Sequence, residues 1–305
     1  MKNPCVVAVV AVYFPDGAAL ARLLHRLALQ VQHVVIVDNT EGTPSTSLQS
    51  TASTSQTWLL LGRNTGIAHA QNLGVELARE RGATHILFMD QDSLPPADMV
   101  PRLLHTLASA APDRHVAAVG PLCRDVKTGR IIPLIQRRGW RIQRTVPEGP
   151  EPIGVEYIPA SGTLAPIAAL ERVGPLRAEY FIDRVDVEWC LRARHLGMDI
   201  LVEPQCVMQH DQATRTVRLL GRTLYIGRDF RAYFHVRNSV AMATKAAISP
   251  FWRLDQGIKI VPYILLHILT AQHGRTRMAG VLLTAVRDGL LGRMDRGHYA
   301  QRLLR

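Results

Sequence analysis

The segment Thr84-His85-Ile86-Leu87-Phe88-Met89-Asp90-Gln91-Asp92-Ser93 decides the fold expected for this chain. Its apolar run predicts a buried parallel strand, and two carboxylates follow at positions i and i+2. Open α/β sheets place ligands at the carboxyl ends of their strands. Hard cations such as Mg²⁺ and Mn²⁺ prefer oxygen ligands, usually one or two carboxylates together with substrate phosphates. The segment therefore indicates a site for a nucleotide diphosphate and a divalent cation; the alternative is a strand-to-helix turn whose acids only cap a helix.

Predicted strands and helices alternate on both sides of this segment. Strands are expected at residues 6–12, 33–37, 57–61, 85–89 and 116–119, and helices at 18–30, 66–81 and 96–111. Further along, we expect a surface loop at 42–56, a hairpin or insertion within 122–157, strands at 158–163, 200–202 and 207–209, and helices at 181–196, 231–245 and within 253–303. The alternation predicts βαβ units and an α/β fold with a mostly parallel, Rossmann-like sheet flanked by helices.

The composition narrows the class of protein. The chain has 305 residues, of which 47% are hydrophobic, so it is long enough to bury a full core. It has no run of about 18 apolar residues, so no spanning helix is expected, and residues 5–14 are interpreted as a first strand, not a signal peptide. The cysteines lie far apart, which favours reduced thiols in the cytoplasm over disulfides or a zinc site. They are Cys5, Cys123, Cys190 and Cys206.

The net charge of +11 is unevenly distributed. Residues 1–210 carry 20 basic and 20 acidic side chains, whereas residues 211–305 carry 16 basic and 5 acidic ones. The basic excess in the last third predicts a partner with anionic groups, such as phosphates, an anionic membrane face or nucleic acid; the alternative is a solvated basic surface.

Other polar positions are candidates for the same site. Asp38 ends the second predicted strand, where a carboxylate can bind a base or ribose. Asn64–Asn72 opens a helix whose N-terminus favours phosphate, and Gly66, Ala70 and Gly74 recur every four residues, so a backbone or ligand can approach that face closely.

Three acids lie within six residues before another predicted helix: Asp183, Asp186 and Glu188. Asp183 and Asp186 would share a helical face, and either is a plausible general base toward an acceptor hydroxyl. Glu188 is expected to hold structure together with Arg192 at i+4. Acids in a first helical turn also favour the helix dipole, which is the structural alternative for each of them.

The order of these motifs resembles the family-2 glycosyltransferases with a GT-A fold, within them the rhamnosyltransferase branch. The resemblance runs from about Val6 to Ala243. It rests on Val37-Asp38-Asn39, Asn64–Asn72, Asp90-Gln91-Asp92, Ala160-Ser161-Gly162-Thr163, Val185-Asp186, the run Asp183–Arg194, and Tyr233-Phe234-His235-Val236-Arg237-Asn238.

The resemblance implies site roles. Asp186 would be the catalytic base, with Asp183 as the alternative because Val185 replaces a Glu common in the family. Asp92 and His210, with Asp90, would bind Mg²⁺ or Mn²⁺. The residues expected to bind the sugar nucleotide are Asp38, Asn64, Gly66, Asn72, Asp90 and Arg237, with Arg215 or Arg218 as further candidates for the diphosphate.

The implied activity is an inverting transfer of L-rhamnose from dTDP-L-rhamnose to a hydroxyl of a lipid-linked, O-antigen-type polysaccharide acceptor. The first alternative is a GT-A transferase whose donor is a different sugar nucleotide, a UDP- or GDP-sugar. The second is a non-catalytic basic protein that binds nucleic acid or membrane. A nucleotidyltransferase is disfavoured because the loop Phe14-Pro15-Asp16-Gly17 lacks cations for a triphosphate.

The expected organisation is a GT-A domain at residues 1–245 and a C-terminal helical basic region at 246–305. Within the domain, residues 1–121 would bind the nucleotide sugar and 122–245 the acceptor and catalytic groups. The terminal helices would contact the inner face of a membrane, form a homo-oligomer interface or complete the core. The expected location is the cytoplasm, with peripheral membrane contact and no nucleic-acid partner.

Overall fold

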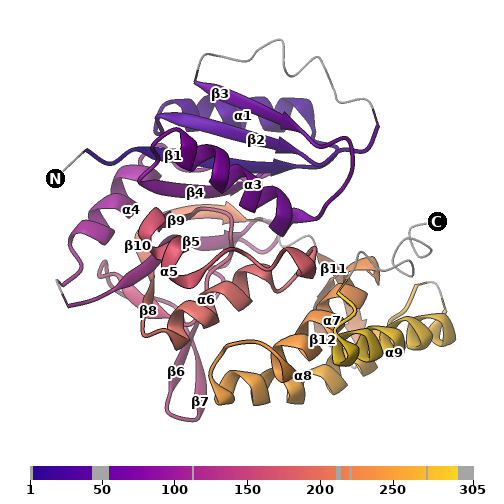
Figure 1. Ribbon diagram of the computed structural model, residues 1–305. Helices are drawn as coiled ribbons and strands as arrows, with labels where there is room; N and C mark the ends of the chain where they lie inside the picture. Colours follow the sequence, from indigo (N-terminus) through magenta and orange to yellow (C-terminus); the bar gives the residue numbers. More distant parts are fainter. Residues whose placement is uncertain are drawn as a thin grey trace.

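The computed structural model of the chain describes residues 3–42, 55–111, 113–210, 214–219, 222–227, 229–272 and 274–294. An eight-stranded sheet in the order β3-β2-β1-β4-β9-β5-β10-β8 forms its centre (Figure 1). Its strands are β1 (Val6–Val12), β2 (His33–Asp38), β3 (Gln56–Leu60), β4 (His85–Asp90), β5 (Val116–Asp125), β8 (Ile153–Val155), β9 (Thr163–Pro166) and β10 (Asp199–His210).

Most neighbouring strands of this sheet run parallel. Strands β3, β2, β1 and β4 are parallel to one another, and so are β5 and β10. Strand β9 runs antiparallel between β4 and β5, and β8 runs antiparallel at the edge beside β10. The prediction of a mostly parallel α/β sheet is confirmed.

Alternate side chains of β1 belong to two different core clusters, as the period of a strand requires. Val7 and Val9 belong to the cluster that includes residues of α3 (Ile67–Glu80), α5 (Ile167–Val173) and α6 (Val185–His195). Val6 and Val10 belong to the cluster that includes α1 (Gly17–Ala28) and α4 (Met99–Ala108). Both faces of the sheet are therefore covered by helices, which explains why its strands are apolar throughout.

A third core cluster joins the last three helices, α7 (Asp229–Thr244), α8 (Pro250–Leu269) and α9 (Arg275–Leu291). These helices lie together beside the sheet (Figure 1). The cluster thus includes α7 as well as the helices of the predicted C-terminal region. Within the described residues, no helix is long and apolar enough to cross a membrane.

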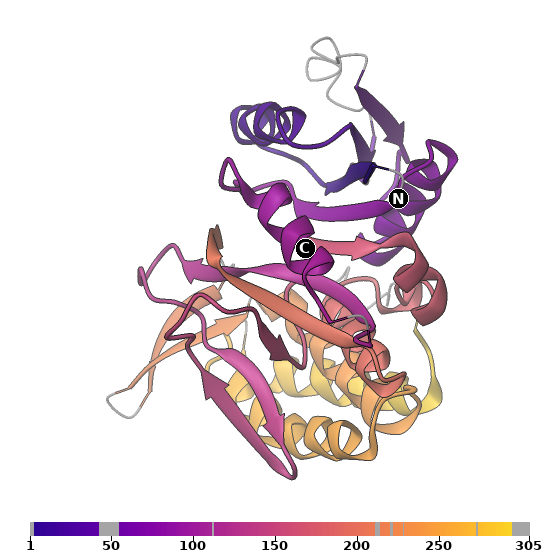
Figure 2. The ribbon, with the colours of Figure 1, turned by 90° about the vertical axis from the view of Figure 1, so that its left-hand side faces the viewer.

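Two hairpins and a short 3-10 helix complete the described elements. The hairpin β6 (Leu134–Arg138) and β7 (Arg141–Thr145) lies within 122–157, where a hairpin was predicted, and it projects from the body (Figure 2). The second hairpin, β11 (Thr214–Leu219) and β12 (Arg222–Gly227), was not predicted. Helix η1 spans Ala178–Tyr180. Most of the predicted 42–56 loop lies outside the described residues.

Two strand predictions are wrong. The strand expected at 158–163 begins only at Thr163, because Gly162 has a φ of +84° and Thr163 N–H bonds back to the Ala160 carbonyl at 3.0 Å. The two strands expected at 200–202 and 207–209 are one strand, β10, with a register shift between Glu203 and Val207. Proline is tolerated within a sheet at such irregularities, so Pro204 does not end the strand.

Candidate active site

Three parallel strands end side by side at one edge of the sheet. Val12, the last residue of β1, lies opposite Asp38 at the end of β2, and Ala11 lies opposite Asp90 at the end of β4. Because β9 is antiparallel to both β4 and β5, strands β5 and β10 also end at this edge, which brings His210 to it. The polar residues that end these strands in the sequence therefore lie at one edge in the fold.

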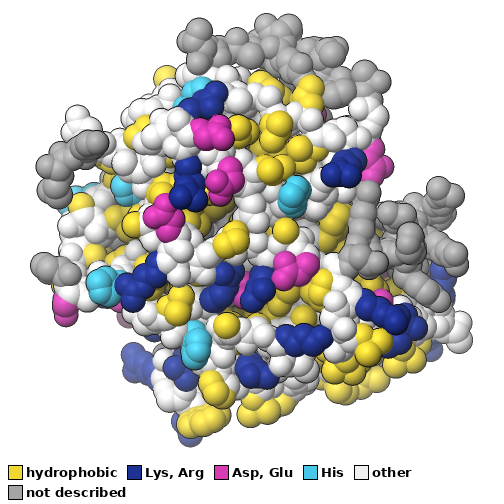
Figure 3. Space-filling model, in the orientation of Figure 1, with side chains coloured by type: hydrophobic (Ala, Val, Ile, Leu, Met, Phe, Trp, Pro, Cys, Tyr) yellow, Lys and Arg dark blue, Asp and Glu magenta, His cyan; other side chains and the backbone are white. Residues whose placement is uncertain are grey.

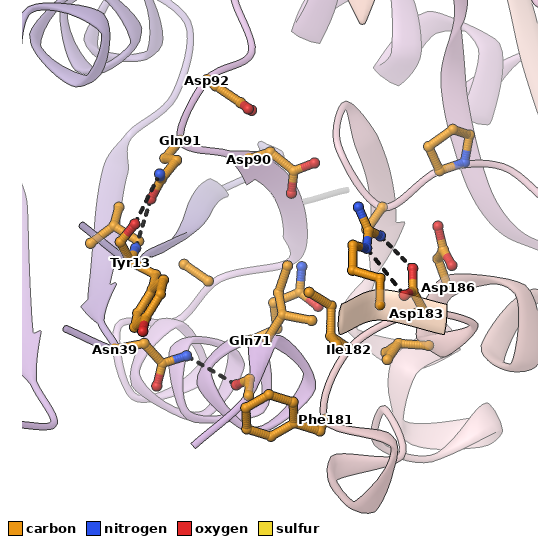
Figure 4. A pocket seen from close by; sticks show the side chains of 18 of the residues that line it. Tyr13, Asn39, Gln71, Asp90, Gln91, Asp92, Phe181, Ile182, Asp183 and Asp186 are labelled. Atoms are coloured by element: carbon orange, nitrogen blue, oxygen red, sulfur yellow. Dashed lines mark hydrogen bonds and ion pairs between the residues drawn. The ribbon is translucent and has the colours of Figure 1, made fainter. Parts of the chain in front are cut away.

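A cavity of about 520 Å³ opens at this edge (Figure 4). Its walls come from the ends of β1 and β4, the start of α3, and the segment that leads into α6. Seven of the ten predicted site residues line it: Asn64, Gly66, Asp90, Asp92, Asp183, Asp186 and His210. The fold thus brings together residues that are far apart in the sequence.

Asp90 lies on the sheet side of the cavity and faces Asp183 and Asp186 across it (Figure 4). Burial and the negative charges of Asp92 and Asp186 raise its pKa to about 7, against a smaller opposing effect of Arg231. Its backbone N–H donates to the Ser161 hydroxyl at 3.1 Å. The carboxyl group is thus held in a site with excess negative charge, which a bound cation would relieve.

Asp92 and His210 reach the cavity rim from two different segments. An isolated antiparallel bridge joins Leu94 to Gln209, two residues beyond Asp92 and one before His210. Asp92 is exposed and His210 is half-buried. Among the described residues, no three His, Cys, Asp or Glu side chains are grouped closely enough to hold a metal by themselves. The oxygens of a diphosphate would therefore have to contribute ligands, as is usual for Mg²⁺.

Asp186 lies in the first turn of α6, at the side of the cavity opposite Asp90. The Val187 N–H donates to its Oδ1 at 2.8 Å, and a backbone hydrogen bond from Ala160 also orients it. Burial raises the pKa of Asp186, and the charge of Asp183 adds to this effect, while the backbone donors oppose it. A carboxylate with a raised pKa is a better proton acceptor near neutral pH.

Asp183 is bound to Arg231, the third residue of α7. The Arg231 Nε donates to Asp183 Oδ2 at 3.1 Å, and an Nη donates to the other carboxylate oxygen (Figure 4). Arg231 also lines the cavity. Both oxygens of Asp183 are therefore hydrogen-bonded to a guanidinium, whereas Asp186 is held by backbone N–H groups, and the cations Arg184 and Arg231 act on it only through their charge.

Gly66 allows a close approach between α3 and the loop before α6. Its φ is +87°, and a Cβ there would lie 2.6–2.8 Å from three atoms of Phe181. The Ile67 N–H donates to the Phe181 carbonyl at 2.8 Å, and Asn39 Nδ2 donates to the Gly66 carbonyl at 3.0 Å. The predicted close approach of a backbone is confirmed at Gly66, whereas Gly74 packs against the Val9 side chain of β1.

The other three predicted residues are not among those that line the cavity. Asp38 is buried and accepts the Thr40 N–H at 2.8 Å. Asn72 bonds through its amide to both the N–H and the carbonyl of Leu176. Arg237 is fully buried in α7, and its guanidinium donates to the carbonyls of residues 179 and 180. The contacts of Asn72 and Arg237 are therefore structural ones that hold the loop before α6.

Sequence reasoning missed several residues that line the cavity: Tyr13, Asn39, Gln71, Gln91, Phe181, Arg184 and Arg231. Gln91 fixes the end of β1, since it accepts the Tyr13 N–H at 2.6 Å and donates to the Tyr13 carbonyl at 3.1 Å. Its place between two site aspartates was the signal that could have identified it. Arg215 and Arg218 fall in β11, whose side chains lie outside the described part.

Comparison with known proteins identifies the family of the chain. Residues 8–161 match the family described as glycosyl transferase family 2. The chain is 32% identical over 304 residues to the dTDP-rhamnosyl transferase RfbF of Shigella flexneri, in an alignment that covers 97% of this chain and 99% of that protein.

Two solved structures share the fold. One is S. aureus TarS 1-349 in complex with UDP-GlcNAc, with a TM-score of 0.56, 12% identity, and coverage of 95% of this chain and 83% of that one. The other is GalNAc-T7 with UDP, GalNAc and Mn²⁺, with a TM-score of 0.58 and 13% identity; the match covers 89% of this chain but only 58% of that protein. The predicted GT-A-type fold is confirmed, and the chain is a glycosyltransferase that belongs to glycosyl transferase family 2.

Proposed function

We propose that the chain transfers L-rhamnose from dTDP-L-rhamnose, with inversion, to a hydroxyl of a lipid-linked polysaccharide acceptor. The observation that carries this proposal is that Asp90 and Asp186 line the same cavity and face each other across it. The identity to a dTDP-rhamnosyl transferase along nearly the whole chain supports the choice of donor. The acceptor is the one that the resemblance to the rhamnosyltransferase branch implies, a hydroxyl of a growing cell-surface polysaccharide.

The reaction is a direct displacement. The acceptor oxygen forms a bond to the anomeric carbon while the bond from that carbon to the diphosphate oxygen breaks, and the nucleoside diphosphate leaves with the electron pair. Asp186 takes the proton of the acceptor hydroxyl. Its backbone hydrogen bonds fix its orientation, and its raised pKa suits proton transfer near neutral pH. Such positioned base catalysis typically contributes about 10²–10⁴ in rate.

The donor set fits a divalent cation. Asp90 has a pKa raised by burial and by neighbouring carboxylates, and Asp92 and His210 border the same rim. Mg²⁺ or Mn²⁺ held by these residues and the diphosphate would neutralise charge on the leaving group. At the other wall, Arg231 is a candidate to contact the diphosphate, a role that was expected of Arg237.

The donor is tested by incubating the protein and a lipid-linked saccharide acceptor with dTDP-L-rhamnose, UDP-glucose or GDP-mannose and measuring the released nucleotide. We expect release from dTDP-L-rhamnose only, loss of release in chelator, and recovery with Mn²⁺ or Mg²⁺. Release from a UDP- or GDP-sugar alone would overturn the donor, and full activity in chelator would overturn the metal. Thermal stabilisation by an oligonucleotide but not by dTDP with Mn²⁺ would overturn the enzymatic function.

A further inference from the structure

Helix α8 has two opposite faces. Its inner face is buried through Trp252, Gln256 and His267. Five apolar residues at spacings of four, three, four and four form its outer face and lie within about 80° of arc at 3.6 residues per turn. They are Leu254, Ile258, Val261, Leu265 and Leu269, and each is more than half exposed, with 53–64% of its surface accessible. A folded chain rarely leaves so continuous an apolar stripe on its surface without a partner.

The tip of the β6–β7 hairpin meets the start of this helix. Trp140, at the tip, is 76% exposed, yet its ring lies against Phe251 with centroids 5.7 Å apart. The Arg137 guanidinium lies over the same Phe251 ring, 5.2 Å from its centroid. The hairpin tip and α8 reach the same side of the molecule in both ribbon views (Figures 1 and 2). They therefore present one surface.

This surface is basic around its apolar centre. The hairpin carries four exposed arginines and no acid: Arg137, Arg138, Arg141 and Arg144. Arg253 and Lys259 border the stripe on its two sides, Lys259 in an ion pair with Asp255. Hydrophobic and basic side chains lie along the lower rim in the space-filling view (Figure 3).

We propose that Trp140, the apolar stripe of α8 and the hairpin arginines dock the protein on the surface of an anionic lipid bilayer. An amphipathic helix with a leucine- and isoleucine-rich face inserts that face at the boundary between headgroups and acyl chains. Tryptophan is favoured at the same depth, and arginines beside the inserted face are attracted by anionic headgroups. Each part of the surface thus matches one layer of the bilayer.

A second copy of the chain fits this surface less well. A two-fold contact pairs the patch with an identical patch, so both sides would bring the four hairpin arginines to the interface and neither would bring an acid from its hairpin. Juxtaposed like charges oppose association, whereas anionic headgroups neutralise them. The proposal rests on this surface and not on the identity of the sugar donor, although a lipid-linked acceptor would be reached from a bilayer.

The test is sedimentation of the full chain with vesicles. One set contains phosphatidylcholine alone, and the other contains phosphatidylcholine and phosphatidylglycerol at about 3:1, since the anionic lipid supplies the surface potential. We expect binding to the anionic vesicles that weakens with salt. The double variant Ile258→Gln/Leu265→Gln should lose about tenfold or more in partitioning to vesicles, because it removes apolar area that would be buried in the bilayer. Arg138→Gln/Arg141→Gln should lose the preference for anionic vesicles.

Leu29→Gln is the matched control, because Leu29 is 72% exposed at the end of α1, outside this surface. It should bind vesicles like the unchanged chain, and all variants should keep their melting temperature and their release of nucleotide in vesicle-free buffer. Equal sedimentation of the Ile258/Leu265 variant and the unchanged chain would overturn the proposal. The proposal would also be overturned if the chain bound neither kind of vesicle, or if the unchanged chain formed a dimer that the Ile258/Leu265 variant did not form. A chain that binds vesicles but releases no nucleotide would contradict the proposed function alone.

Discussion

Arg231 and Asp183 form a two-pronged ion pair across 48 residues of sequence, with Nε 3.1 Å from Oδ2. The pair joins the start of α7 to the loop before α6, in the wall of the cavity. Because Arg231 holds both oxygens of Asp183, Asp186 is the better candidate for accepting a proton. The ion pair therefore distinguishes Asp183 from Asp186, the two acids that the sequence left as alternatives for the catalytic base.

Asp186→Asn should bind dTDP with Mn²⁺ like the unchanged protein but lose transfer by about 10²–10⁴, the usual contribution of a general base. The amide can still accept the Val187 N–H, so the local structure should persist. Nucleotide release in the presence of acceptor measures transfer, and thermal stabilisation by dTDP measures binding. Near-normal turnover would remove Asp186 from its role. Asp183→Asn should instead lower the melting temperature, because it breaks the ion pair.

Arg231→Gln should weaken dTDP binding by about 10- to 100-fold, the value of a hydrogen bond to a charged group. It removes a cation from the cavity wall while leaving Asp90 and Asp186 in place. Calorimetric titration with dTDP in the presence of Mn²⁺ measures the loss. Arg79→Gln is the control, because it breaks an exposed ion pair with Glu171 on the surface. If the two variants bound dTDP equally well, Arg231 would have no contact with the diphosphate.

The sequence was most informative where one local pattern decides the structure. The apolar runs of β1, β2 and β4 place Asp38 and Asp90 at one sheet edge, because parallel strands end together. The Glu188–Arg192 pair at i+4 is confirmed, with both N–O distances at 3.0 Å around a fully buried Glu188. Spacing within one helix suffices to predict such a contact.

The sequence was least informative where two distant segments meet. Arg237 was expected to bind the diphosphate, yet it is buried against the backbone carbonyls of residues 179 and 180. Asn72 likewise bonds to backbone, since its amide pairs with the N–H and the carbonyl of Leu176, 104 residues away. Arg231 acquires its role only through the packing of α7 against the loop before α6. None of these partners follows from local periodicity.

The pKa of Asp90, raised to about 7, predicts a pH dependence of stability without metal. A carboxyl whose pKa is higher in the folded than in the unfolded chain stabilises the fold at low pH, and this contribution is lost as pH rises through the folded pKa. The unchanged protein should therefore lose stability relative to Asp90→Asn between about pH 4 and pH 7. Melting temperatures of both proteins in chelator measure the difference. A constant difference across this range would contradict the raised pKa.

Binding of Mn²⁺ should depend on the same group. The cation needs the ionised carboxylate, so its binding should release a proton near pH 7 and weaken about tenfold for each pH unit below the pKa. Titrations of Mn²⁺ in the presence of dTDP, in two buffers with different ionisation enthalpies, measure the released proton. Asp38→Asn is the control, because Asp38 is not among the residues that line the cavity. Binding that is independent of pH between 5 and 8 would exclude Asp90 as a ligand.

Gly66→Ala should abolish donor binding through two separable effects. The backbone of Gly66 (φ +87°, ψ 156°) lies in a region essentially restricted to glycine, which costs an alanine about 1–3 kcal/mol, and the new Cβ would overlap Phe181, which adds about 1–3 kcal/mol or displaces the loop that carries Asp183. Gly82→Ala is a control for a positive φ without the overlap, because its φ is +74° and a Cβ there meets nothing within 4 Å. Both variants should therefore lower the free energy of unfolding, but only Gly66→Ala should also lose stabilisation by dTDP with Mn²⁺. If the two variants bound dTDP equally, the contact between α3 and Phe181 would not be needed to shape the cavity.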